Sequence, residues 1–363
     1  MLFYTLVLAA GLRVVPSSPT TIARSVLRDL TRVVGAASVT GVSLSRVALA
    51  SDSLIFPVDC SDSVAVLRGP GGREVVIVGT AHISEESVEV VKRTINGVKP
   101  DVVMIELDVK RLGKVSEADM AQKGFILPSA VEVNVPIPEV VVASDGATPV
   151  AALSPPSTPI PNKRKRIGNS VQGFMSSMRQ GAASLAGNAL KKGLGSFYDS
   201  VEKLGFTAGG EFQAAIQEAF AMHTPVLLGD QDVDTTLQNL AAALSKTNTD
   251  SFLKLIDDLD AAERELGIEL PSDPDAQMTR DQMAGFVEKL KTRRALDLVM
   301  GTLQKEAPLI YQAMIGDRDA YMANSITGQA NSRVMVAVVG MAHLSGIERN
   351  LATKGFSVVS RKC

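Results

Sequence analysis

Two similar stretches indicate the fold: EVVIVGTAH at residues 74–82 and VMVAVVGMAH at residues 334–343. Each opens with an apolar run rich in β-branched residues, which favours a buried strand, and each closes with Gly-X-Ala-His. Glycine allows the chain to turn sharply where a strand ends. We therefore expect a histidine at the start of each following helix. These two residues, His82 and His343, are two of the three histidines in the chain.

The first Gly-X-Ala-His turn belongs to a strand–helix–strand unit. Ser84 is a favourable helix cap followed by two acids, which predicts a helix to about Ile95, ended by Asn96-Gly97. The next apolar run, residues 101–105, ends in Glu106-Leu107-Asp108, and so short a crossover is typical of a parallel sheet. The rest of the pattern predicts strands at 225–228, 334–339 and 356–359, and helices at 210–222, 232–245, 250–266, 279–300, 303–325 and from the second turn to about 351.

We therefore expect an α/β fold, with a mainly parallel sheet, flanking helices and an added helical region. Four of the predicted strands end in polar side chains, which are His82, Glu106, Asp230 and His343. Parallel strands share one carboxyl edge, and ligands bind in the crevice outside that edge. The sequence predicts a site at the C-terminal edge of the strands.

Imidazoles and carboxylates together are the usual ligands of a divalent metal ion, here of the Zn, Mn or Co class. We expect His82 and His343 as ligands, and Glu106 or Asp108 as a further ligand or as the general base. Arg111 or Arg318 would hold a substrate carboxylate through two parallel hydrogen bonds. Asp230, which follows its own strand at the same edge, is a further catalytic candidate. Two alternatives stay open: a His–Glu pair that activates water without metal, and histidines that only cap helices. His223 lies at a predicted helix end, where a cation meets the C-terminal dipole.

The composition excludes several classes of protein. The 363 residues carry 37 basic and 39 acidic side chains and no tryptophan, which argues against nucleic-acid binding and against a stacking platform. The two cysteines, Cys60 and Cys363, form no disulfide framework and favour a reducing compartment. No uninterrupted apolar run reaches the roughly 18 residues that a membrane span needs.

The chain divides into four segments by composition. Residues 1–52 are rich in Arg and Ser and poor in acids, which is typical of an organelle transit peptide, mitochondrial or else plastid; a secretory signal is the competing interpretation. Residues 53–127 begin the folded domain and residues 168–363 complete it. Residues 128–167 are so rich in proline that we expect a disordered insertion. A helix over 169–200, weakened by glycine, is a candidate for peripheral membrane or partner association.

The order of six short motifs resembles the TraB/PrgY (pheromone-shutdown) family. The match spans roughly residues 62–360 around the insertion, and its motifs are Gly79–His82, Val103–Asp108 with Arg111, Gly210–Phe212 with Ala214-Ala215, Leu228–Asp230, Asp317–Asp319 with Met322-Ala323, and Gly340–His343.

The family is similar to the Tiki proteases, which share two GxxH motifs and a required metal, and to the erythromycin-esterase and ChaN folds. The resemblance implies that His82, Glu106 and His343 form the shared active-site set. One departure is Gln231, which follows Asp230 where the family usually has arginine. Two functions follow: a metal-dependent hydrolase acting on a peptide or protein, or a non-catalytic, organelle-associated adaptor that keeps the fold.

Overall fold

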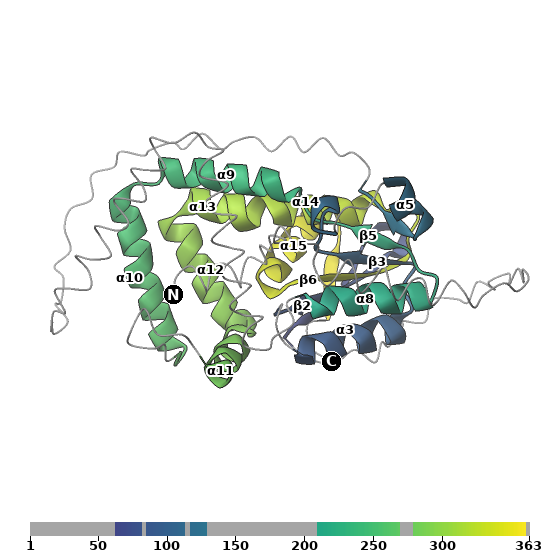
Figure 1. Cartoon of the computed structure of the whole chain (residues 1–363), viewed down its shortest axis with the longest axis horizontal. Coiled ribbons are helices and arrows are strands. Elements are labelled where there is room, and N and C mark those ends of the chain that lie inside the picture. The colour runs from purple at the N-terminus through teal and green to yellow at the C-terminus, as the bar shows by residue number, and fades with distance from the viewer. Residues whose placement is uncertain (1–61, 82–84, 113–116, 129–208, 269–278, 361–363) are drawn as a thin grey trace, which may run out of the picture.

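The computed structural model describes residues 62–81, 85–112, 117–128, 209–268 and 279–360 (Figure 1). The strands in these ranges are β1 (Val64–Arg68), β2 (Glu74–Thr80), β3 (Val102–Ile105), β4 (Phe125–Ile126), β5 (Val226–Leu228), β6 (Val334–Gly340) and β7 (Ser357–Ser360). The helices are α3 (Glu85–Val98), α4 (Val109–Leu112), α5 (Glu117–Gln122), α8 (Gly210–Ala221), α9 (Val233–Lys246), α10 (Thr249–Glu265), α11 (Arg280–Leu290), α12 (Arg293–Glu306), α13 (Pro308–Tyr311), α14 (Asp317–Gly328) and α15 (Met341–Thr353).

The seven strands form one sheet in the order β4-β5-β3-β6-β2-β1-β7. From β4 to β2 every neighbouring pair is parallel, whereas β1 runs antiparallel to both β2 and β7. The expected α/β fold with a mainly parallel sheet is confirmed. β2 and β3 are connected through α3 but are not neighbours, because β6 from the end of the chain lies between them.

Both faces of the sheet are buried, as the alternation along β2 demonstrates. Val76 and Val78 belong to a core shared with α3 and α8, whereas Val75 and Ile77 belong to the core on the other side. Successive side chains of a strand point to opposite faces, so an almost continuous apolar run is what a doubly covered strand requires.

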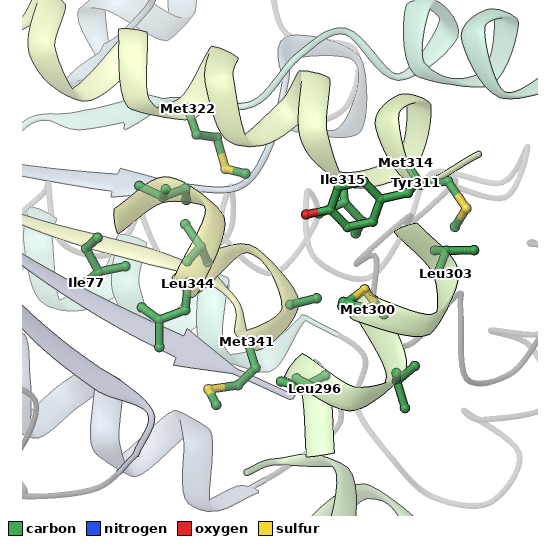
Figure 2. Packing of buried hydrophobic residues seen from close by; sticks show 14 of the residues in the cluster. Ile77, Leu296, Met300, Leu303, Tyr311, Met314, Ile315, Met322, Met341 and Leu344 are labelled. Atoms are coloured by element: carbon green, nitrogen blue, oxygen red, sulfur yellow. The ribbon is translucent and has the colours of Figure 1, made fainter. Parts of the chain in front are cut away.

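The second core joins the sheet to the helical region. Figure 2 shows Leu296, Met300 and Leu303 of α12 near Tyr311, Met314 and Ile315, with Met341 and Leu344 of α15 between them and the strand residue Ile77. In Figure 1 helices α9 to α13 extend beyond the sheet on the side where α15 lies. The helical region therefore shares one core with the sheet through α14 and α15.

Several sequence-based boundaries were wrong. Helix α3 continues through Asn96-Gly97 and ends at Val98, and the next residue, Lys99, has a φ of +50°. The predicted helix at 279–300 is two helices, because the side chain of Thr292 accepts a hydrogen bond from Ala295 N and caps a new start. Pro308 similarly ends α12 and begins α13, since it has no amide hydrogen to donate.

Strands β1 and β4 were not predicted at all. Other predictions lie outside the described residues: the N-terminal segment 1–52, the insertion 128–167 apart from Pro128, the helix 169–200, and the cap Ser84. Among the described residues no helix is both long and apolar enough to span a bilayer.

Candidate functional site

The two Gly-X-Ala-His turns leave the sheet from neighbouring strands. β2 and β6 are parallel, with Gly79 opposite Val339 and Thr80 opposite Gly340. Gly340 is also the residue before α15, so His343 lies in the first turn of that helix. His82 itself lies outside the described residues. The prediction that both histidine turns follow strands of one parallel edge is supported by this register.

His343 is completely buried between two acids. Its Nδ1 atom lies 2.7 Å from Oδ1 of Asp319 on α14, and its Nε2 atom lies 3.5 Å from Oε1 of Glu106. An ionised carboxylate only accepts hydrogen bonds, so Nδ1 carries the hydrogen that Asp319 accepts. In the neutral imidazole this places the lone pair on Nε2, on the side of Glu106.

Glu106 connects the ends of β3 and β6. The side chain is 1% exposed, and its Oε2 accepts a hydrogen bond from the backbone nitrogen of Gly340 at 2.5 Å. Its Oε1 accepts a hydrogen bond from Nη2 of Arg318, and the same oxygen faces His343. The carboxylate is therefore held in one orientation at the strand edge.

Asp230 and the two arginines form the remainder of the cluster. Arg318 donates from Nε to Oδ1 of Asp230 at 3.2 Å and from Nη2 to Oδ2 at 2.7 Å, and Arg111 also donates to Oδ2. Arg111 Nε donates to Asp108 Oδ1 at 2.8 Å, and Val233 N donates to the other oxygen of Asp108. The predicted site residues Glu106, Arg111, Asp230, Arg318 and His343 are thus brought into one buried network.

The formal charge of this network is unbalanced. Among the described residues that it joins, four carboxylates (Glu106, Asp108, Asp230 and Asp319) face the two guanidinium groups of Arg111 and Arg318. An isolated buried charge is costly, and a buried pair is favourable only with close geometry and further hydrogen bonds. With His343 neutral, these six side chains carry two more negative than positive formal charges.

The pKa values follow from burial and from these partners. Burial disfavours the charged form of Asp230, but Arg318 and Arg111 outweigh it and hold the pKa of this carboxyl far below its usual range. Burial lowers the pKa of His343, but Glu106 and the hydrogen bond to Asp319 outweigh it, so the pKa is raised. For Asp319, burial dominates and raises the pKa. A cation at His343 is therefore electrostatically favoured.

The described residues supply only part of the expected metal site. They contain no group of three or more His, Cys, Asp or Glu side chains arranged to hold a metal ion. His343 and Glu106 are two donors of the expected kind, and the third expected ligand, His82, is outside the described ranges. The donor types fit a divalent ion of the zinc class.

The arginines and His223 occupy the following positions. Arg111 and Arg318 are 6% and 1% exposed and bind carboxylates of this chain, so their expected contact with a substrate carboxylate remains a prediction. His223 lies between α8 and β5, with a φ of +57°. It therefore precedes the strand whose far end carries Asp230, at the opposite edge of the sheet.

Sequence reasoning did not select Asp319 as a site residue. Arg318 and Asp319 are consecutive on α14, about 100° apart around the helix, and they contact different partners. The available signal was the sequence Asp317-Arg318-Asp319, in which acids flank an arginine. Gly346 was also missed: a Cβ there would lie 1.7 Å from Oδ2 of Asp319.

Fold and site together define an α/β protein with an acid–arginine–histidine cluster at the carboxyl edge of a parallel sheet. The model of the TraB/PrgY/gumN family matches residues 183–360. An uncharacterized protein of Methanocaldococcus jannaschii is 26% identical over 290 residues, which cover 79% of this chain and 56% of that protein. TraB domain-containing proteins of Mus musculus and Homo sapiens are 26% and 25% identical over 308 residues, covering 80% of this chain and 66% of theirs.

The predicted resemblance to the TraB/PrgY family is confirmed by this match and by these relatives. The aligned region spans between 56% and 66% of the length of these relatives.

Proposed function

We propose that this protein is a metal-dependent, peptidase-like hydrolase whose metal is held by His82, His343 and Glu106. One juxtaposition carries the proposal: Nε2 of His343 faces Oε1 of Glu106 at 3.5 Å while Asp319 occupies Nδ1. With a neutral imidazole these two atoms are both acceptors, so a proton or a metal cation between them is required to make the contact favourable.

The charge of the cluster supports a divalent ion. Four carboxylates and two guanidinium groups make the surroundings of His343 net negative, which favours a cation at this position. Metal ligation by a histidine requires the neutral form, so the cation takes the place of the imidazole proton.

The residues of the chain have separate tasks in this proposal. Arg318 and the amide of Gly340 hold the Glu106 carboxylate, and Asp319 holds the His343 ring. Arg111 and Arg318 together keep Asp230 ionised. The chemistry that a bound divalent ion supplies here is the activation of water at neutral pH. A peptide or protein is the proposed substrate class.

Metal content of the full-length protein tests the proposal. The purified chain is reconstituted with Zn²⁺, Mn²⁺ or Co²⁺, desalted and measured by mass spectrometry, beside His82→Ala, His343→Ala and the double variant. His223→Asn is the matched control, since asparagine tolerates the positive φ at that position. Near-stoichiometric metal is expected in the wild type and control and its loss in the double variant, with circular dichroism checking the fold. Equal metal content in the double variant would remove the ligand assignment.

A second function is favoured by a different observation. Both guanidinium groups of the cluster bind carboxylates of the chain itself, as expected if the site serves only the fold. In that case the protein is a non-catalytic, organelle-associated adaptor. Absence of metal from the wild type after all three reconstitutions supports this function and contradicts the hydrolase.

The composition of residues 1–52 supports a proposed mitochondrial address. Fluorescence microscopy of the intact chain, compared with the chain lacking residues 1–52, tests it. Mitochondrial signal that is lost on truncation is expected, whereas plastid or diffuse signal from the intact chain contradicts it.

A further inference from the structure

We propose that Asp319 is the positioning residue that fixes the tautomer and direction of His343, and that Gly346 is the residue that makes room for it. The inference rests on the proposed function, because it concerns the ring nitrogen that His343 would present to the metal. Asp319 acts through His343 and is not itself proposed as a ligand.

The first observation is the contact between Asp319 and His343. Oδ1 of Asp319 lies 2.7 Å from Nδ1 of His343, and the two residues are 2% and 0% exposed, respectively. Water therefore does not compete for Nδ1, and the carboxylate decides which nitrogen carries the hydrogen. Histidines that ligate metals nearly always donate their other ring hydrogen to a carboxylate, carbonyl or water, which fixes ring orientation and raises the basicity of the ligating atom.

The second observation is independent and concerns the backbone of α15. A Cβ placed on Gly346 would lie 1.7 Å from Oδ2 and 2.4 Å from Cγ of Asp319, distances that no real side chain adopts. Gly346 follows His343 by three residues, so both face α14 from the same side of the helix. Glycine is otherwise unfavourable in a helix interior, and the close approach of Asp319 accounts for its presence here.

The geometry also defines what the ring is positioned toward. Asp319 lies on the Nδ1 side, and Glu106, at the end of β3, lies on the Nε2 side. β6 and β2 end in register, so the first Gly-X-Ala-His turn leaves the sheet at the same edge. Loss of Asp319 would release the ring from this direction without removing either proposed donor atom.

The test reads the tautomer of His343 directly, without metal and without any activity. The full chain is labelled with ¹⁵N-histidine, and long-range ¹H–¹⁵N spectra are recorded at alkaline pH, where the imidazole is neutral. The chain contains only three histidines, so the spectrum is simple, and His223 reports on the fold. The Nδ1–H tautomer is expected for His343 in the wild type.

Two variants and one matched control extend the test. Asp319→Asn and Gly346→Ala are expected to populate the Nε2–H tautomer and to weaken Zn²⁺ affinity by about 10- to 100-fold. Gly301→Ala is the control, because that helical glycine has open space where its Cβ would be. It is expected to leave both the tautomer and the affinity unchanged.

The outcomes separate this inference from the proposed function. A wild-type protein with the Nε2–H tautomer overturns the inference without reference to any variant. Unchanged tautomer and Zn²⁺ affinity in Asp319→Asn also overturn it, while metal binding by the wild type still stands. A wild type that binds no metal overturns the proposed function, and with it the metal-directed role of Asp319, whichever tautomer is recorded.

Discussion

Arg318 and Asp230, 88 residues apart in sequence, form a two-pronged ion pair at the carboxyl edge of the sheet, with Nε to Oδ1 at 3.2 Å and Nη2 to Oδ2 at 2.7 Å. The same guanidinium also binds Glu106. A single side chain of α14 thereby ties the ends of β3 and β5 to the helix that carries Asp319. Stability and the geometry of the site therefore depend on the same contacts.

Replacement of Arg318 is expected to be severe. Arg318→Met removes the guanidinium that two buried carboxylates, Glu106 and Asp230, share, and removal of one partner of a buried pair typically costs about 3–5 kcal/mol of unfolding free energy. Urea denaturation measures the loss. Arg294→Met is the control, because the side chain of Arg294 is 81% exposed and its ion pair with Glu265 is worth about 0–1 kcal/mol. Equal effects of the two substitutions would contradict the role of Arg318.

The lowered pKa of the Asp230 carboxyl group predicts how the stability of the fold depends on pH. The pKa of its carboxyl is lowered from 3.8, so the unfolded chain binds the proton more readily than the folded chain. The stabilisation is fully present above pH 3.8 and is lost as the pH falls from there through the folded pKa. As the pH is lowered below 3.8, the unfolding free energy should therefore fall more steeply for the wild type than for Asp230→Asn. Parallel curves below pH 3.8 would show that Asp230 contributes nothing to this decline.

Arg73 is expected to secure the end of α14. Its guanidinium donates to the carbonyl oxygens of Ile326, Thr327, Gln329 and Ser332. Arg73→Ala removes the guanidinium from all four acceptors, with an expected loss of about 1–3 kcal/mol in thermal or chemical denaturation. Arg333→Ala, at an exposed position nearby, should stay within about 0.5 kcal/mol of the wild type. A comparable loss in both variants would argue against specific capping by Arg73.

Removal of metal is expected to lower thermal stability. A ligand that binds only the folded state stabilises it by about 2.7 kcal/mol at a concentration of 100 times Kd. Addition of a chelator should therefore lower the Tm of the reconstituted wild type and leave that of the His82→Ala His343→Ala variant unchanged. Calorimetry measures both, and a chelator effect of the same size in the double variant would place any bound metal elsewhere.

Much of the site was predictable because its residues follow buried strands that end at the same edge of the sheet. β2, β3, β5 and β6 are buried on both faces, so their apolar runs are conspicuous, and the polar residues that follow each run mark the shared edge. Glu106, Asp230 and His343 were accordingly found from the sequence. β1 is less completely buried, because Val66 is only partly buried and Arg68 is exposed, and β4 has only two residues, so neither produces a clear pattern.

Other features depend on tertiary contacts that no local pattern encodes. The position of β6 between β2 and β3 is decided by long-range pairing, not by the order of elements along the chain. The breaks at Thr292 and Pro308 depend on which of several capping residues the packed helices use. The roles of Asp319 and Gly346 depend on the close packing of α14 and α15. The carboxylate of Asp319 occupies the space where a Cβ on Gly346 would lie.

Anomalous X-ray diffraction at the zinc edge, from crystals of the full chain reconstituted with Zn²⁺, shows whether His343 and Glu106 hold a metal. We expect one anomalous peak in contact with Nε2 of His343 and a carboxylate oxygen of Glu106, with the ring still hydrogen-bonded to Asp319. A well-ordered cluster without any peak, or a peak that contacts neither residue, would contradict it.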